Sequence, residues 1–133
     1  MEQQARTLQP GQRSQLFTYD LDTGASTLVA ESSSVLFEAP NWTLDGDWLI
    51  VNGDGLLQRV PSGGGELEPI DVPGLPLLNN DHVLSPDGTS AYVSGFDGHL
   101  SSLQCVPRWL GQCRAACSTG GHERALSRWV VAQ

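Results

Sequence analysis

The chain has 133 residues, enough for one domain with a core of ordinary size. Its 15 acidic residues against 7 arginines, with no lysine, give a net charge of −8, which argues against a surface that binds nucleic-acid phosphates. No apolar run approaches the ~20 residues of a membrane-spanning helix, and the start lacks the features of a signal peptide. As written, the sequence therefore predicts a cytoplasmic protein, or a periplasmic one if its true N-terminus is missing.

Residues 1–14 are polar, lack periodicity and contain Pro10-Gly11, which predicts a disordered or loosely attached lead-in. From Gln15 the chain reads as a strand, a turn at residues 22–24 and a second strand. This hairpin matches a later segment at a spacing of 41 positions, with Leu16 aligned to Leu57 and Gly24 to Gly65. The chain is therefore predicted to begin in the middle of a repeating unit.

The stretch 41–100 contains two copies of one pattern, in which a turn and an apolar alternating strand occur twice. The residues that recur 42 positions later are Thr43, Asp45, Gly46, Leu49 and Val51, which become Ser85, Asp87, Gly88, Ala91 and Val93. A unit of about 40–45 residues built from short strands is typical of a propeller blade. We therefore predict an all-β fold, an incomplete β-propeller of about two four-stranded blades over residues 15–100.

Residues 48–52 are apolar on both faces of the predicted strand. Trp48, Ile50 and Asn52 share one face, whereas Leu49 and Val51 share the other. A strand of this kind is buried on both sides, as in stacked blades. The proline-rich segment 69–76 is predicted to cross from one blade to the next.

Residues 101–133 differ in composition from the rest of the chain. They hold one acid, four arginines and all three cysteines, and the alternating pattern is predicted to stop at Leu100. We interpret this part as an atypical tail, either disordered or translated out of frame, and the nucleotide sequence would decide. Zinc binding is disfavoured, because the candidate ligands have unsuitable spacings. Those candidates are Cys105, Cys113, Cys117 and His122.

The segment from about Leu16 to Leu100 resembles the TolB-like (WD-like) β-propeller repeat family, whose blades carry a W-S-P-D-G type turn before an apolar strand. The matching segments are residues 42–46 (WTLDG) and 84–88 (LSPDG). Leu44 departs from the usual proline, so the first copy keeps the Asp-Gly turn without the stiffened entry. The resemblance implies a periplasmic or cytoplasmic binding scaffold rather than one particular activity.

Residues 79–82 (NNDH) form the densest polar cluster outside the turns. By the resemblance, this cluster falls on the connection between blades or on the innermost strand, which lines a propeller's channel. Asn80, Asp81 and His82 are therefore candidate ligand-binding residues, and His82 beside Asp81 could act as a general base. The structural alternative is that Asn and Asp bond to the loop backbone while His82 ties strands together.

The scattered aspartates are predicted to stabilise turns rather than to bind calcium, which needs six to eight converging oxygens. They are Asp20, Asp22, Asp45, Asp47, Asp54, Asp87 and Asp97. We expect neither a metal nor another cofactor.

The sequence favours a non-catalytic binding or scaffold module, which would bind a protein partner or a small polar ligand. We expect neither nucleic acid nor membrane as a partner. Self-association through exposed blade faces is expected, because a partial propeller leaves such faces bare. The alternative is a fragment of a propeller enzyme, either a lyase or the propeller domain of a serine peptidase. The chain has no G-x-S-x-G elbow for a serine hydrolase site of its own.

Overall fold

The computed structural model describes residues 6–72, 74–96, 101–107 and 128–132, and these form strands, turns and loops without a helix. The strands are β1 (Ser14–Asp20), β2 (Ser26–Ser32), β3 (Phe37–Trp42), β4 (Trp48–Gly53), β5 (Leu56–Pro61), β6 (Glu68–Pro69), β7 (Leu78–Leu84), β8 (Ser90–Phe96), β9 (Ser101–Pro107) and β10 (Arg128–Ala132). Within these ranges no helix is long and apolar enough to span a bilayer.

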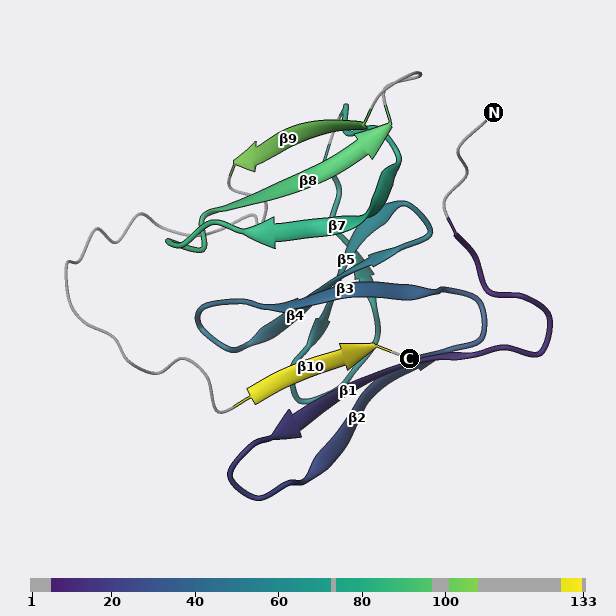
Figure 1. Ribbon diagram of the computed structural model, residues 1–133, viewed down its shortest axis with the longest axis vertical. Helices are drawn as coiled ribbons and strands as arrows, with labels where there is room; N and C mark the ends of the chain where they lie inside the picture. Colours follow the sequence, from purple (N-terminus) through teal and green to yellow (C-terminus); the bar gives the residue numbers. More distant parts are fainter. Residues whose placement is uncertain (1–5, 73, 97–100, 108–127, 133) are drawn as a thin grey trace.

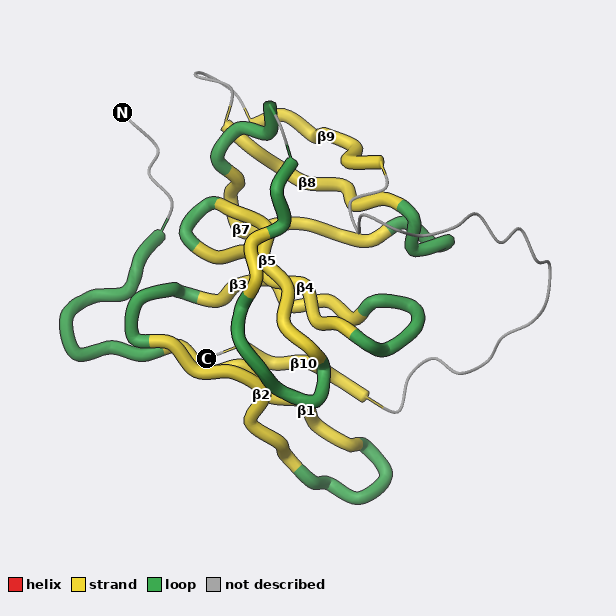
Figure 2. Tube along the Cα trace, turned by 180° about the vertical axis from the view of Figure 1, so that it is seen from behind, coloured by secondary structure: helices red, strands yellow, loops and turns green. Residues whose placement is uncertain are grey.

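The strands form three antiparallel sheets that lie one after another, as Figures 1 and 2 show. The first sheet has the order β10-β1-β2, the central sheet β3-β4-β5-β6 and the third sheet β7-β8-β9. The predicted fold class, an all-β incomplete propeller, is confirmed. The sequence indicated about two four-stranded blades. The described residues instead form three sheets, a central one of four strands and two outer ones of three, and β10 joins the N-terminal hairpin in the first sheet.

Two of the segments assigned to the tail form strands, so the prediction that the strand pattern stops at Leu100 is wrong there. β9 pairs with β8 along its whole length, from Phe96↔Ser101 to Ser90↔Pro107. β9 forms because β8 would otherwise have a free edge, whose backbone N–H and C=O groups need hydrogen-bond partners. Residues 108–127, which include Cys113, Cys117 and His122, lie outside the described residues, as does Asp97. The out-of-frame origin of the tail stays a hypothesis.

The predicted lead-in ends slightly earlier than expected, because Ser14 is already part of β1. Its hydroxyl is buried and accepts a hydrogen bond from the Phe37 backbone N–H at 2.9 Å, which ties the first sheet to the central one. Earlier in the lead-in, Arg6 forms an ion pair with Glu38. Residues 1–5 are not among those described.

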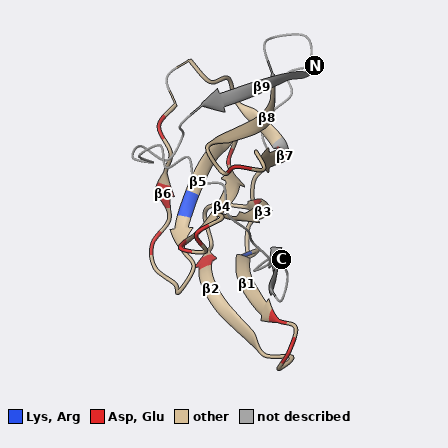
Figure 3. Ribbon diagram, turned by 90° about the vertical axis from the view of Figure 1, so that its left-hand side faces the viewer, with Lys and Arg blue, Asp and Glu red and all other residues tan. Residues whose placement is uncertain are grey.

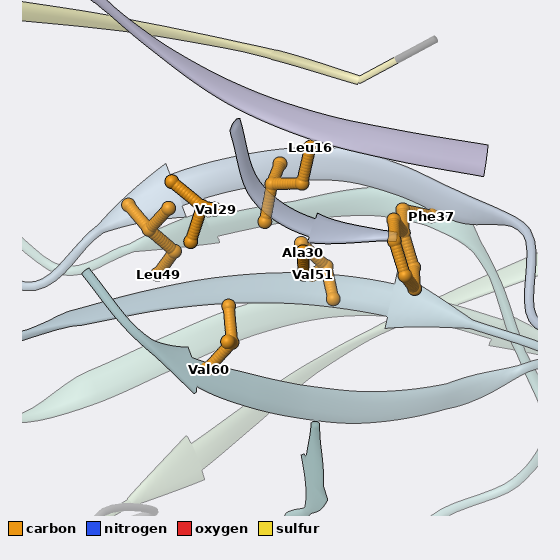
Figure 4. Close-up of a cluster of buried hydrophobic side chains, with 7 residues drawn as sticks. All are labelled: Leu16, Val29, Ala30, Phe37, Leu49, Val51 and Val60. Atoms are coloured by element: carbon orange, nitrogen blue, oxygen red, sulfur yellow. The ribbon is translucent and has the colours of Figure 1, made fainter. Parts of the chain in front are cut away.

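Two clusters of buried apolar side chains hold the three sheets together. The first cluster lies between the first and central sheets (Figure 4) and contains Leu16, Val29, Ala30, Phe37, Leu49, Val51 and Val60. The second cluster lies between the central and third sheets and contains Ile50, Leu57, Leu78, Ala91 and Val93. Strand β4 supplies Leu49 and Val51 to one cluster and Ile50 to the other, which confirms the prediction that it is buried on both faces.

The two Asp-Gly turns carry the same hydrogen bonds. In the later turn the Ser85 hydroxyl accepts from the Ser90 N–H (2.9 Å) and donates to the Asp87 carboxylate (2.6 Å). In the earlier turn the Thr43 hydroxyl accepts from the Trp48 N–H at 3.0 Å and donates to Asp45. The repeat seen in the sequence is therefore a repeat of turn chemistry.

The aspartates of these turns bond to their own local segments, as expected for turn residues. Hydrogen bonds from Ser85 and then from Thr89 lower the pKa of Asp87 to about 2. In the first hairpin, Asp20 accepts from the backbone N–H groups of Asp22 (2.9 Å) and Thr23 (3.0 Å). Figure 3 shows acidic residues at such turns and strand ends.

We expect Ser85→Ala to lower the free energy of unfolding by about 1–2 kcal/mol, because a buried hydroxyl that bonds both sides of the turn is lost. Urea denaturation followed by circular dichroism measures the change. The control is Ser26→Ala at an exposed position in β2, with an expected change within about 0.5 kcal/mol. Equal losses in the two variants would show that the turn network adds nothing.

Candidate ligand site on strands β3 and β7

Strands β3 and β7 are the first strands of the central and third sheets, and they contact each other. Both are bulged: the pairing of β3 with β4 shifts between Glu38 and Asn41, and that of β7 with β8 shifts between Leu78 and His82. Ala39, inside the β3 bulge, has a φ of 48°. A bulge interrupts the regular alternation of side chains, so it can redirect polar groups at a strand that otherwise packs in the interior.

The asparagines of this region bond mainly to backbone and neighbouring strands. The Asn41 side chain donates to the carbonyl oxygen of His82 at 3.2 Å, and that of Asn52 donates to the carbonyl of Asn79. Asn79 in turn donates to the Ser94 hydroxyl at 2.6 Å and accepts from the Asp81 N–H at 3.1 Å. These bonds join the central sheet to the third sheet and hold the β7 bulge in place.

His82 is buried, with 9% of its surface exposed, and it pairs with Val93 of β8. Burial lowers its pKa to about 4, against the smaller raising effects of the nearby Ile50 backbone and the charge of Asp81. Neither ring nitrogen has a partner with hydrogen-bond geometry among the described residues. At neutral pH the imidazole is therefore uncharged, and no carboxylate holds it in one tautomer as a general base requires.

The three candidate ligand residues have different surroundings. Asp81 is exposed, whereas its neighbour His82 is buried at the sheet interface. Asn80 belongs to β7, but its side chain lies outside what the structure describes. Of the three, Asp81 is the side chain shown to be accessible to a ligand.

Two polar residues that the sequence analysis did not single out as site residues lie in the same region. Asn52 and Asp54 each have a buried side-chain oxygen without a hydrogen-bond partner in the described part of the chain. The two residues precede Gly55, whose carbonyl accepts from the Leu78 N–H at 2.9 Å, so they stand beside the start of β7. Asn52 could have been noticed as a polar residue on the buried face of an otherwise apolar strand.

The titratable groups that the structure describes do not form a metal centre. No three His, Cys, Asp or Glu side chains among them lie close enough together to hold an ion. The arrangement at β7 offers one exposed carboxylate on a backbone fixed by asparagine side chains, which suits hydrogen bonding or ion pairing with a ligand.

Comparisons with known proteins support the fold more strongly than the activity. No family model matches the chain. An uncharacterized protein of Agrobacterium fabrum is 37% identical over 118 residues, a match that covers 87% of this chain and 36% of that protein. A solved structure from Agrobacterium tumefaciens, described as a "putative TolB", has 33% identity and a TM-score of 0.67, and the match covers 73% of this chain and 35% of the other. The chain therefore has a TolB-like fold and spans about a third of the length of these relatives.

Proposed function

We propose that the chain is a non-catalytic binding module of the TolB-like propeller type, which binds its ligand at the β7 segment of Asn80, Asp81 and His82, with Asp81 as the contact and His82 as a support from below. The observation that carries this proposal is the β7 bulge, which leaves Asp81 exposed while Asn79 accepts from the Asp81 N–H at 3.1 Å. A fixed backbone reduces the entropy lost when a side chain binds a ligand. The TolB-like fold supports a scaffold role, since propellers carry many functions on one architecture.

The ligand that fits Asp81 is a protein segment or small polar molecule that carries an ammonium or guanidinium group. A carboxylate only accepts hydrogen bonds, and guanidinium groups bind it with two parallel bonds. The net charge of −8 adds a long-range attraction for cationic ligands. His82, buried at the sheet interface, would contribute by holding the β7 backbone beneath Asp81.

The alternative, a fragment of a propeller enzyme, requires a group in β7 that exchanges protons. His82 is the candidate, and burial places its pKa at about 4, without a hydrogen-bonded partner among the described residues to orient it. A residue in that state is a poor base at neutral pH, so the binding module is the better supported proposal. Location in the cytoplasm or the periplasm remains part of the proposal and does not decide between the two.

We expect arginine amide with its α-amino group acetylated to shift the backbone NMR signals of Asp81 and its neighbours in the ¹⁵N-labelled protein. Citrulline amide acetylated in the same way carries an uncharged urea in place of the guanidinium and should shift them much less. Asp81→Ala should weaken arginine amide binding at least about tenfold, as expected when a charge-assisted hydrogen bond is lost. Asp71→Ala removes the same charge at another exposed position and should leave the binding unchanged.

Two results would reject Asp81 as the ligand contact. One is that Asp81→Ala binds arginine amide as the unmodified chain does. The other is that Asp71→Ala weakens binding equally, which would indicate attraction by net charge alone.

A further inference from the structure

The outer faces of the first and third sheets correspond, by the sequence repeat, to the two faces of the central sheet that are buried within this chain. The central sheet is covered on both sides, by the first and third sheets, and Ile50 and Val60 on its two faces are fully buried. Among the described residues, the first and third sheets each have a neighbouring sheet on one side. Because the units repeat, the buried positions of the central sheet identify the residues that would be buried if the outer faces were covered.

On the third sheet the uncovered face carries Val83 and Tyr92, which are 56% and 38% exposed and pair across β7 and β8. Tyr92 stands 42 positions after Ile50, the residue that packs against the third sheet in the second cluster. The face with Val83 and Tyr92, here called the Tyr92 face, is therefore of the same kind as the Ile50 face of the central sheet.

On the first sheet the uncovered face carries Phe17, Tyr19 and Leu28. Tyr19 is 40% exposed, Leu28 is exposed and Phe17 is half-buried, and Phe17 pairs directly with Leu28. Tyr19 stands 41 positions before Val60, the fully buried residue that faces the first sheet. This surface, here called the Tyr19 face, is therefore of the same kind as the Val60 face.

The two faces complement each other in kind. At the junction of the central and third sheets, the Ile50 face of the central sheet packs against the face of the third sheet that carries Ala91 and Val93. At the junction of the first and central sheets, the Val60 face of the central sheet packs against the face of the first sheet that carries Leu16. In both junctions an Ile50-type face meets a Val60-type face. A Tyr92 face therefore suits a Tyr19 face and not another Tyr92 face. Figure 1 shows the central sheet between the first and third sheets. Each of the two faces lies on the side of its sheet away from the central sheet, so within one chain they are at opposite ends of the stack.

From this geometry we propose that two copies of the chain associate head to tail, with the Tyr92 face of each copy on the Tyr19 face of the other. Two copies of three sheets make six, within the range of 4–8 blades at which propellers close. Tyrosine suits such a surface, because its ring buries apolar area while its hydroxyl keeps a polar contact. Closure with two copies leaves no outer face bare.

Sedimentation velocity over a range of concentrations tests the association. We expect a reversible equilibrium between the 14.3 kDa chain and a species of twice that mass. Since each copy carries a net charge of −8, raising the salt concentration should tighten the dimer by screening repulsion. A single monomeric species at all concentrations overturns the proposal, and so does a ladder of larger species without a stop at two copies.

A mixing experiment tests the head-to-tail arrangement. Tyr92→Asp and Tyr19→Asp alone should each weaken the dimer at least tenfold, since both interfaces of either homodimer then contain one aspartate. A mixture of the two variants should restore a dimer in part, because one of its two interfaces is then unmodified. The control is Leu44→Asp at the exposed turn of the central sheet, which should dimerise like the unmodified chain.

Circular dichroism of each variant shows whether its strands still form. With folded variants, failure of the mixture to dimerise better than either variant alone overturns the head-to-tail pairing. Asp81 stands two positions before Val83 on β7, next to the Tyr92 face, so a dimer would cover it. Arginine amide binding is therefore measured in the Tyr19→Asp variant, which keeps Asp81 and the Tyr92 face but should not dimerise, so either proposal can fail without the other.

Discussion

Ile50→Ala is expected to lower the free energy of unfolding by about 3–5 kcal/mol, a large part of the roughly 5–15 kcal/mol that stabilises a domain. Ile50 is fully buried, and its side chain lies in the second cluster between the central and third sheets. Truncation removes apolar contacts and leaves a cavity between two sheets. Because both sheets are fixed by their own hydrogen bonds, they cannot move together to fill it. Urea denaturation followed by tryptophan fluorescence measures the loss, because Trp48 packs against the same cluster.

The matched control for this substitution is Leu44→Ala. Leu44 is 68% exposed at the turn between β3 and β4, and the expected change is within about 0.5 kcal/mol. Ile50→Val should fall between the two, with a loss of about 1 kcal/mol. If Ile50→Ala and Leu44→Ala cost the same, the second face of β4 is not buried and the stacked arrangement is wrong.

Acid is expected to destabilise the chain through His82 before it affects the turns. The folded pKa of His82 is about 4 against an ordinary value of 6.5, so the unfolded chain binds more protons between these two pH values. The part of the free energy of unfolding that depends on uncharged His82 is therefore fully present above pH 6.5. It decreases as the pH falls and is lost by about pH 4. A shift of this size corresponds to about 3 kcal/mol. Urea denaturation at a series of pH values measures it.

His82→Leu separates this effect from other acid-sensitive groups. The variant keeps an apolar side chain at the buried position and cannot titrate, so its stability should change little between pH 6.5 and pH 4. Asp87, with a pKa of about 2, loses its contribution at lower pH and does not interfere in this window. The same slope in His82→Leu as in the unmodified chain would show that His82 is not the group responsible.

Much of the fold could be predicted because the repeat records the same physical constraints twice. Thr43 and Ser85 bond to equivalent groups in equivalent turns, and both lie 42 positions apart in the sequence. The apolar residues on both sides of Trp48–Gly53 predicted a strand covered on two faces, which the two clusters confirm. Local patterns of this kind depend on period and turn chemistry, which a single sequence contains.

The strands β9 and β10 could not be predicted in the same way. β10 pairs with β1 at the other end of the chain, as in Phe17↔Val131 and Thr18↔Val130, so its partner is not visible from the local pattern. β9 follows a break in composition, and the cysteines and arginines obscured its short alternation around Leu103 and Cys105. In both cases an available strand edge decides the structure, and local preference does not.

The candidate site was located from its polar composition, but its arrangement was not. Regular alternation fails at the bulge before His82, so the sequence could not tell that His82 is buried while Asp81 is exposed. Nor could it tell that the Asn79 side chain bonds to Ser94. Ligand contact by Asn80, Asp81 and His82 stays a prediction.

The stacking of three sheets about β4 is tested most directly by methyl NOE spectroscopy on the chain labelled at Ile, Leu and Val. We expect NOEs from the Ile50 methyls to the second cluster, which holds Leu78 and Val93, and from the Leu49 methyls to the first, which holds Leu16 and Val29. Ile50 and Leu49 should share no partner across the sheet. NOEs from both residues to one common set of methyls would contradict a central sheet buried on two faces.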